Sequence, residues 1–170
     1  MAAFEERLAR HAEAAGEFAT TAMAGPEERW TVRPKEGKWC PAEITDHLIK
    51  AYDTHLVELR GGPGLRVRTP FFRRMLYRMV VLPKILREGF LPRGVPAPRE
   101  VLPTLPAEPR RATVERFTER AREFETAARE RATRGTGGLT HPYLGPLMLD
   151  QSVRFVEVHV RHHRKQLSTE

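Results

Sequence analysis

Two histidines near the C-terminus have the spacing of metal ligands on a helix. The chain there reads His159-Val-Arg-His-His163. Residues four apart on a helix stand almost directly above one another, so two such imidazoles can bind one cation from the same side. His162 lies three residues from His159, and spacing alone does not decide between His162 and His163. His163 is favoured, because it shares a helical stripe with His159 that includes an apolar core position. This stripe also holds Ser152, Val156 and Gln166.

A third imidazole lies far away in the sequence, on the apolar face of another predicted helix. His47 shares that face with Ile44, Leu48 and Ala51. A histidine on a core face needs partners for its ring nitrogens, and a facing pair of histidines with a metal ion would supply them. Helical bundles build metal sites in this way, from side chains on facing helices. The alternative interpretation is a buried histidine that is hydrogen-bonded to a hydroxyl or a carbonyl.

Three neutral imidazoles would leave open positions on a divalent metal, which is typical of catalytic sites. All-nitrogen ligation suits zinc, nickel or iron, and spacing does not choose among them. Such a metal lowers the pKa of a bound water or thiol and so produces a nucleophile near neutral pH. The single cysteine, Cys40, excludes both an internal disulfide and a zinc site built on cysteines.

Three further polar residues are candidates for the surroundings of this site. Glu43 stands one turn before His47 and could reach it, although an acid in the first turn of a helix is the favoured interpretation. His141 lies in the turn before the last helix, where it either lines a pocket or pins the turn. Gln166 continues the stripe of His163 toward the C-terminus.

Helical periodicity predicts four main elements to position these side chains. The predicted helices cover residues 4–24, 41–59, 111–133 and 147–167. Proline and glycine mark several of their ends, as in Gly25-Pro26 and at Pro41, which suits a first helical position. No strand of convincing length is predicted. The expected fold is therefore all-α, a four-helix bundle in one domain over residues 1–170, with a long crossover between the second and third helices.

The crossover, residues 63–110, is rich in proline and contains one short basic amphipathic segment, Phe71 to Leu82. This segment could lie on a membrane surface as a helix. The favoured alternative is that it packs over the bundle.

Charge and composition narrow the expected partners and location. The net charge is +7, but basic residues alternate with acidic ones along the helices, which indicates ion-paired, solvated faces rather than a nucleic-acid interface. No apolar stretch is long enough to cross a membrane, and the first residues lack the pattern of a signal peptide. We therefore expect a cytoplasmic protein that binds neither nucleic acid nor membrane.

Three passages together resemble the DinB/YfiT-like superfamily of small bacterial metal-binding bundles. The three passages are Gly37-Lys-Trp-Cys-Pro-Ala-Glu-Ile-Thr-Asp-His47, His141-Pro-Tyr-Leu-Gly-Pro, and His159-Val-Arg-His-His163-Arg-Lys-Gln166. In that family one histidine of the second helix and a histidine pair of the fourth hold the metal. Carried over residue by residue, the resemblance implies His47, His159 and His163 as ligands.

The resemblance also implies a class of function. Relatives include thiol-dependent transferases and isomerases that use bacillithiol, mycothiol or glutathione. A thiol S-transferase or a hydrolase is therefore expected, with a small-molecule substrate, a low-molecular-weight thiol as cosubstrate and a homodimeric assembly. Two alternatives stay open: a binding module for metal or a small molecule without turnover, and a basic surface that binds nucleic acid or a membrane.

Overall fold

Within the described residues, the fold consists of five α-helices, two short 3-10 helices and one very short hairpin. The computed structural model describes residues 2–92, 94–104, 108–135 and 137–167. The α-helices are α1 (Ala2–Ala24), α2 (Pro41–Leu59), α3 (Phe71–Glu88), α4 (Arg110–Thr133) and α5 (Leu149–Leu167), and the 3-10 helices are η1 (Glu27–Arg29) and η2 (Arg99–Val101).

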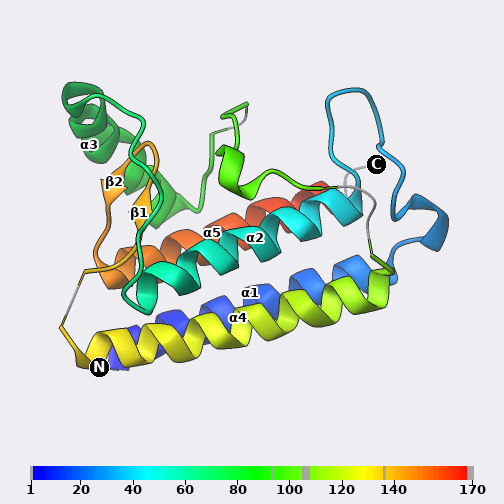
Figure 1. Ribbon diagram of the computed structural model, residues 1–170, viewed down its shortest axis with the longest axis horizontal. Helices are drawn as coiled ribbons and strands as arrows, with labels where there is room; N and C mark the ends of the chain where they lie inside the picture. The colour runs from blue at the N-terminus through cyan, green and yellow to red at the C-terminus, as the bar shows by residue number, and fades with distance from the viewer. Residues whose placement is uncertain (1, 93, 105–107, 136, 168–170) are drawn as a thin grey trace.

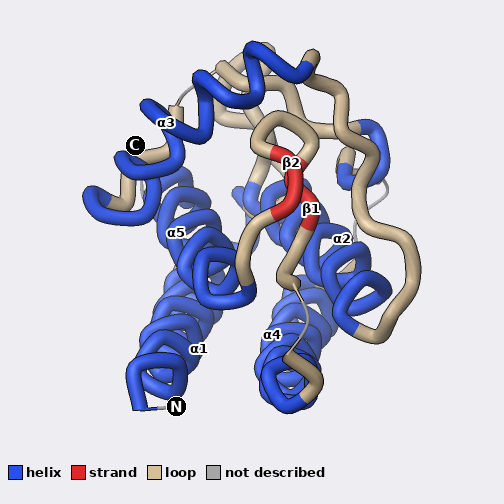
Figure 2. Tube along the Cα trace, turned by 90° about the vertical axis from the view of Figure 1, so that its left-hand side faces the viewer, coloured by secondary structure: helices blue, strands red, loops and turns tan. Residues whose placement is uncertain are grey.

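Four of the helices, α1, α2, α4 and α5, run side by side as a bundle (Figures 1 and 2). Helix α1 packs against α4 and α5, and α2 packs against α4. Fully buried rings fill the centre, with Phe18 and Phe117 in contact at 4.6 Å between ring centroids. The predicted all-α bundle is confirmed, and its helix bounds differ from the predicted ones by no more than two residues.

Helix α2 begins where its sequence predicts. Pro41 occupies the first helical position, and the Glu43 carboxylate accepts a hydrogen bond of 2.9 Å from the Cys40 backbone amide. Arg33 also donates to this carboxylate, with Nε 2.9 Å from Oε2. Glu43 is therefore the acid of the helix start, and among the described residues the group that could hold a metal comprises His47, His159 and His163 without it.

Helix α3 is longer than the predicted segment, because it continues through Pro83 to Glu88. Proline has no amide hydrogen to donate, so Pro83 leaves one hydrogen bond of this helix unmade. Leu82 and Ile85 are buried, and this packing stabilises the turns on both sides of the proline. Gly89 ends the helix with a positive φ of 64°, a conformation that glycine adopts without a steric penalty.

The expectation that α3 packs over the bundle is correct only for its C-terminal half. In its N-terminal half Tyr77 is partly buried against the core, but Phe71, Phe72, Met75, Leu76 and Met79 are exposed. Among the described residues, no helix combines the length and the apolar character needed to cross a membrane.

A small hairpin precedes α5 and was not predicted. Strands β1 (Thr140–His141) and β2 (Gly145–Pro146) pair in antiparallel register, with His141 opposite Gly145. Two-residue strands carry no periodicity that a sequence pattern could reveal. The hairpin lies between α3 and the bundle (Figure 2).

Candidate metal centre

Three histidines from two helices bring their Nε2 atoms together inside the bundle. His47 comes from α2, and His159 and His163 come from α5. The Nε2 atom of His159 lies 3.2 Å from that of His47 and 3.0 Å from that of His163. Ligand atoms of all three residues lie within 4.8 Å of one another, close enough to share one cation. His162 is outside this cluster, as its rotation away from the stripe predicted.

Hydrogen bonds on the far side of two rings determine which nitrogen carries the proton. The Nδ1 atom of His47 lies 2.8 Å from the Val101 carbonyl oxygen, which can only accept, so Nδ1 donates. The Nδ1 atom of His163 lies 2.8 Å from Oε1 of Gln166, while the amide nitrogen of Gln166 faces His162 at 3.1 Å. In the neutral rings of His47 and His163, Nε2 therefore presents a lone pair to the centre of the cluster.

These two lone pairs converge on an atom that cannot satisfy both. Nε2 of His159 carries at most one hydrogen, which it can donate to either His47 or His163. With neutral rings, at least one of the two Nε2–Nε2 contacts of His159 therefore has no hydrogen between its two nitrogens. A divalent cation between the three rings would remove this conflict, because each lone pair would become a ligand. The donor set therefore fits a metal ion.

Burial keeps the three rings in the form that binds metal. His47 and His163 are only 4% and 6% exposed. Burial lowers the pKa of His47 below its usual value of 6.5. Burial, reinforced by the neighbouring imidazoles, places the pKa values of His159 and His163 well below it. All three are therefore neutral near pH 7, and a neutral imidazole is the form that ligates a metal.

An aromatic wall stands beside the cluster. The Trp39 ring centroid is 4.9 Å from that of His47 and 6.3 Å from that of His163, where the rings are stacked. Phe155 lies beside His159 at 6.1 Å. Sequence reasoning did not assign Trp39 to the site, although its place directly before Cys40 and Pro41 fixes it at the end of α2 that carries His47.

The structure also places the two remaining candidate residues. Gln166 contacts His163 directly, as its position on the stripe indicated. His141 pins the hairpin: its Nδ1 atom accepts from the backbone amides of Tyr143 and Leu144, each at 3.2 Å. Its ring packs against Phe155, with 4.8 Å between centroids. His141 therefore belongs to the support of the site through Phe155.

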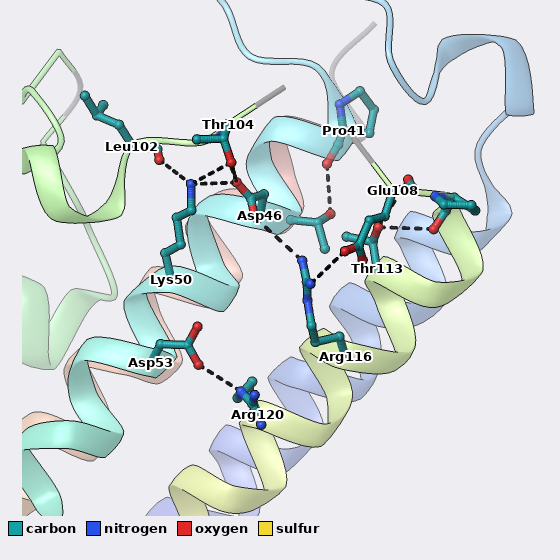
Figure 3. A network of polar contacts seen from close by, with 12 residues as sticks. Pro41, Asp46, Lys50, Asp53, Leu102, Thr104, Glu108, Thr113, Arg116 and Arg120 are labelled. Atoms are coloured by element: carbon teal, nitrogen blue, oxygen red, sulfur yellow. Dashed lines mark hydrogen bonds and ion pairs between the residues drawn. The ribbon is translucent and has the colours of Figure 1, made fainter. Parts of the chain in front are cut away.

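A polar network holds the crossover against α2 and thereby positions the Val101 carbonyl (Figure 3). The Lys50 ammonium donates to the Leu102 carbonyl at 2.7 Å, and the Thr104 amide donates to Asp46 at 2.9 Å. Asp46 and Lys50 also pair with each other at 3.0 Å. The Asp46 side chain is only 17% exposed, because the crossover covers it.

A cavity of about 330 Å³ adjoins this network between α2 and α4 and is lined in part by Asp46, Lys50 and Arg116. A second cavity of similar volume lies along α4, beside Arg60 and Glu130. Neither borders a histidine of the cluster.

The fold and the histidine cluster together describe one class of protein, an all-α bundle in which imidazoles from two facing helices converge in the interior. The family model of the DinB superfamily matches residues 3–167, so the chain belongs to the DinB superfamily. Neither the curated proteins nor the solved structures contain a significant match to the chain.

Proposed function

We propose that this protein is a metal-dependent enzyme whose His47, His159 and His163 hold one divalent cation. One observation carries the proposal: the lone pairs of His47 and His163 both point at Nε2 of His159, which can satisfy only one of them. Membership in the DinB superfamily agrees with it. Zinc, nickel and iron all suit an all-imidazole donor set.

Each residue of the site has a separate role in this proposal. The Val101 carbonyl and Gln166 fix the ring orientations of His47 and His163 by accepting from Nδ1. Such outer partners also make the ligating nitrogen more basic. Trp39 and Phe155 reduce water access from their sides of the cluster. A cation held there supplies Lewis-acid chemistry and lowers the pKa of a water or thiol at its open positions.

The reaction class that we propose is thiol-dependent S-transfer to a small electrophilic substrate, with metal-assisted hydrolysis as the second choice. Two arguments support it: three protein ligands leave positions open for a thiol or water, and the family resemblance implies relatives that are thiol-dependent transferases and isomerases. The cosubstrate would be a low-molecular-weight thiol. A homodimer stays a prediction that rests on family resemblance.

Turnover with and without metal tests the proposal. The protein is loaded with zinc, nickel or iron and assayed with glutathione, mycothiol and bacillithiol against an activated aryl halide and an epoxide, and with activated esters for hydrolysis. We expect turnover that needs the metal, disappears in His159→Ala and survives in His162→Ala. Stoichiometric metal binding without turnover on any substrate would instead support a binding module. Turnover that is unaffected by chelation would contradict the proposal.

A further inference from the structure

Helix α3 exposes a continuous apolar face, which is unusual on a soluble surface. Phe72 is 80% exposed and Met79 is 70% exposed. They lie seven residues apart, which is close to two helical turns, so they share one stripe. The other exposed apolar side chains of this helix flank or continue that stripe: Phe71, Met75, Leu76 and Val80.

The opposite side of α3 fixes this face outward. Leu82 and Ile85 are buried against the rest of the molecule. Arg154 of α5 donates to the Leu86 carbonyl at 3.0 Å, and Arg78 of α3 donates to the Leu144 carbonyl at 3.2 Å. Helix α3 lies across one side of the bundle, away from α1 and α4 (Figure 2). The apolar stripe is therefore held in place on the surface.

Positive charge accompanies the stripe. No acidic residue occurs from Phe71 to Arg87. Arg73, Lys84 and Arg87 are exposed, and among the described residues none of them forms an ion pair. Helical geometry places these three side chains along one flank of the stripe. Arginines of α4 differ, since Arg111 pairs with Glu115 at 2.8 Å, for example.

We propose that α3 docks on an anionic lipid surface, lying in the plane of the membrane. Its apolar stripe would enter the boundary between headgroups and acyl chains, and Arg73, Lys84 and Arg87 would meet the anionic headgroups. A second copy of the chain fits this face less well, because a symmetric contact would bring two unpaired basic flanks together. The proposal is independent of the metal centre, and it reverses the expectation that no membrane is bound.

Flotation of the full chain with vesicles tests this proposal. Vesicles of phosphatidylcholine alone are compared with vesicles that also contain phosphatidylglycerol, at low and at high salt. We expect binding to the anionic vesicles that weakens as salt rises. Phe72→Ser with Met79→Ser should weaken binding by about tenfold or more, because both side chains would lose their burial.

Matched variants control for loss of apolar surface and of charge. Met23→Ser with Val32→Ser removes two exposed apolar side chains outside α3 and should leave vesicle binding unchanged. Arg73→Gln with Lys84→Gln should weaken it by about tenfold or more, because each basic residue near an anionic surface contributes roughly fivefold. Lys35→Gln with Lys38→Gln removes the same net charge from an exposed loop and should have little effect.

Circular dichroism and metal content identify any variant that fails to fold. If the Phe72→Ser, Met79→Ser variant fails to fold, the two charge variants still test the proposal by their difference in vesicle binding. Three results would overturn the proposal: no vesicle binding by the wild type, equal binding to neutral and anionic vesicles, or a dimer in solution that dissociates when Phe72 and Met79 become serine. The last result would assign the face to a second copy of the chain.

Discussion

Single hydrogen bonds orient the imidazoles of the candidate metal centre. Val101 contributes a backbone carbonyl, and Gln166 contributes a side-chain oxygen. Only the second can be removed by substitution without altering the chain path. The sequence placed Gln166 on the helical stripe of His163 without assigning it as a hydrogen-bond partner, and a carbonyl from residue 101 carries no signal in the sequence.

Gln166→Leu should weaken metal binding by about tenfold to a hundredfold, because outer-shell partners typically have effects of this size. Competition titration with a chromogenic chelator measures the change. His162→Ala is the matched control, since it removes the contact between the Gln166 amide nitrogen and His162 and leaves the bond to His163 in place. Equal weakening in both variants would assign the effect to the helix end rather than to the His163 ring.

The buried His55 should make the free energy of unfolding depend on pH. It is buried in α2, and burial, with smaller contributions from nearby histidines, lowers its pKa from 6.5 to about 3. Below pH 6.5 the unfolded chain therefore binds a proton that folded His55 does not. The folded state loses stability as pH falls from 6.5 toward 3, by up to about 1.4 kcal/mol per pH unit for this one group.

His55→Leu should remove that contribution and flatten the pH dependence of the free energy of unfolding in this window. Urea unfolding of metal-free wild type and variant at several pH values measures it. The comparison is made without metal so that ligand release does not contribute. If the free energy of unfolding has the same slope against pH in both proteins, His55 titrates alike in the folded and the unfolded state, and the prediction is wrong.

At the scale of elements, the crossover is more than a connection between α2 and α4. It delivers the carbonyl of Val101 to His47, and Asp46 and Lys50 hold it there through Thr104 and Leu102. Part of this connection, residues 93 and 105–107, lies outside the described residues.

Asp46→Ala should loosen the crossover and lower metal affinity several-fold, toward the roughly tenfold effect of losing a direct outer partner. Asp53→Ala is the control, because Asp53 lies on the same helix but pairs with Arg120 of α4 at 2.8 Å and forms no hydrogen bond or ion pair with the described part of the crossover (Figure 3). Isothermal titration with zinc gives both affinities. A larger loss in Asp53→Ala would show that the α2–α4 contact matters more than the crossover.

The four bundle helices were predictable because each depends on local periodicity and on end signals such as Pro41. The same periodicity placed His47, His159 and His163 on apolar faces. Local periodicity did not predict the full length of α3, because the burial of Leu82 and Ile85 extends this helix past Pro83. It also missed long-range contacts: the cover over Asp46 depends on a segment nearly sixty residues away, through the bond between Asp46 and Thr104.

At the scale of the whole molecule, the metal centre joins α2 to α5, so bound metal should stabilise the entire bundle. A ligand that binds only the folded state adds about 4 kcal/mol at a thousandfold excess over its dissociation constant. For a chain of this length, that corresponds to a rise in Tm of about 10 °C. Differential scanning fluorimetry of zinc-loaded and chelated wild type should show this rise, while His159→Ala should melt at the same temperature in both conditions. A shift of equal size in His159→Ala would place the stabilising metal elsewhere.

Metal content of matched histidine variants tests the central claim most directly. Wild type, His47→Ala, His159→Ala, His163→Ala and His162→Ala are purified alike, reconstituted with one divalent metal, desalted and measured by elemental analysis. We expect about one metal per chain in the wild type and in His162→Ala, and severe loss in the other three, because two imidazoles hold a divalent ion far less tightly than three. Retention of metal in all four variants, or loss in His162→Ala with retention in His163→Ala, would contradict the central claim.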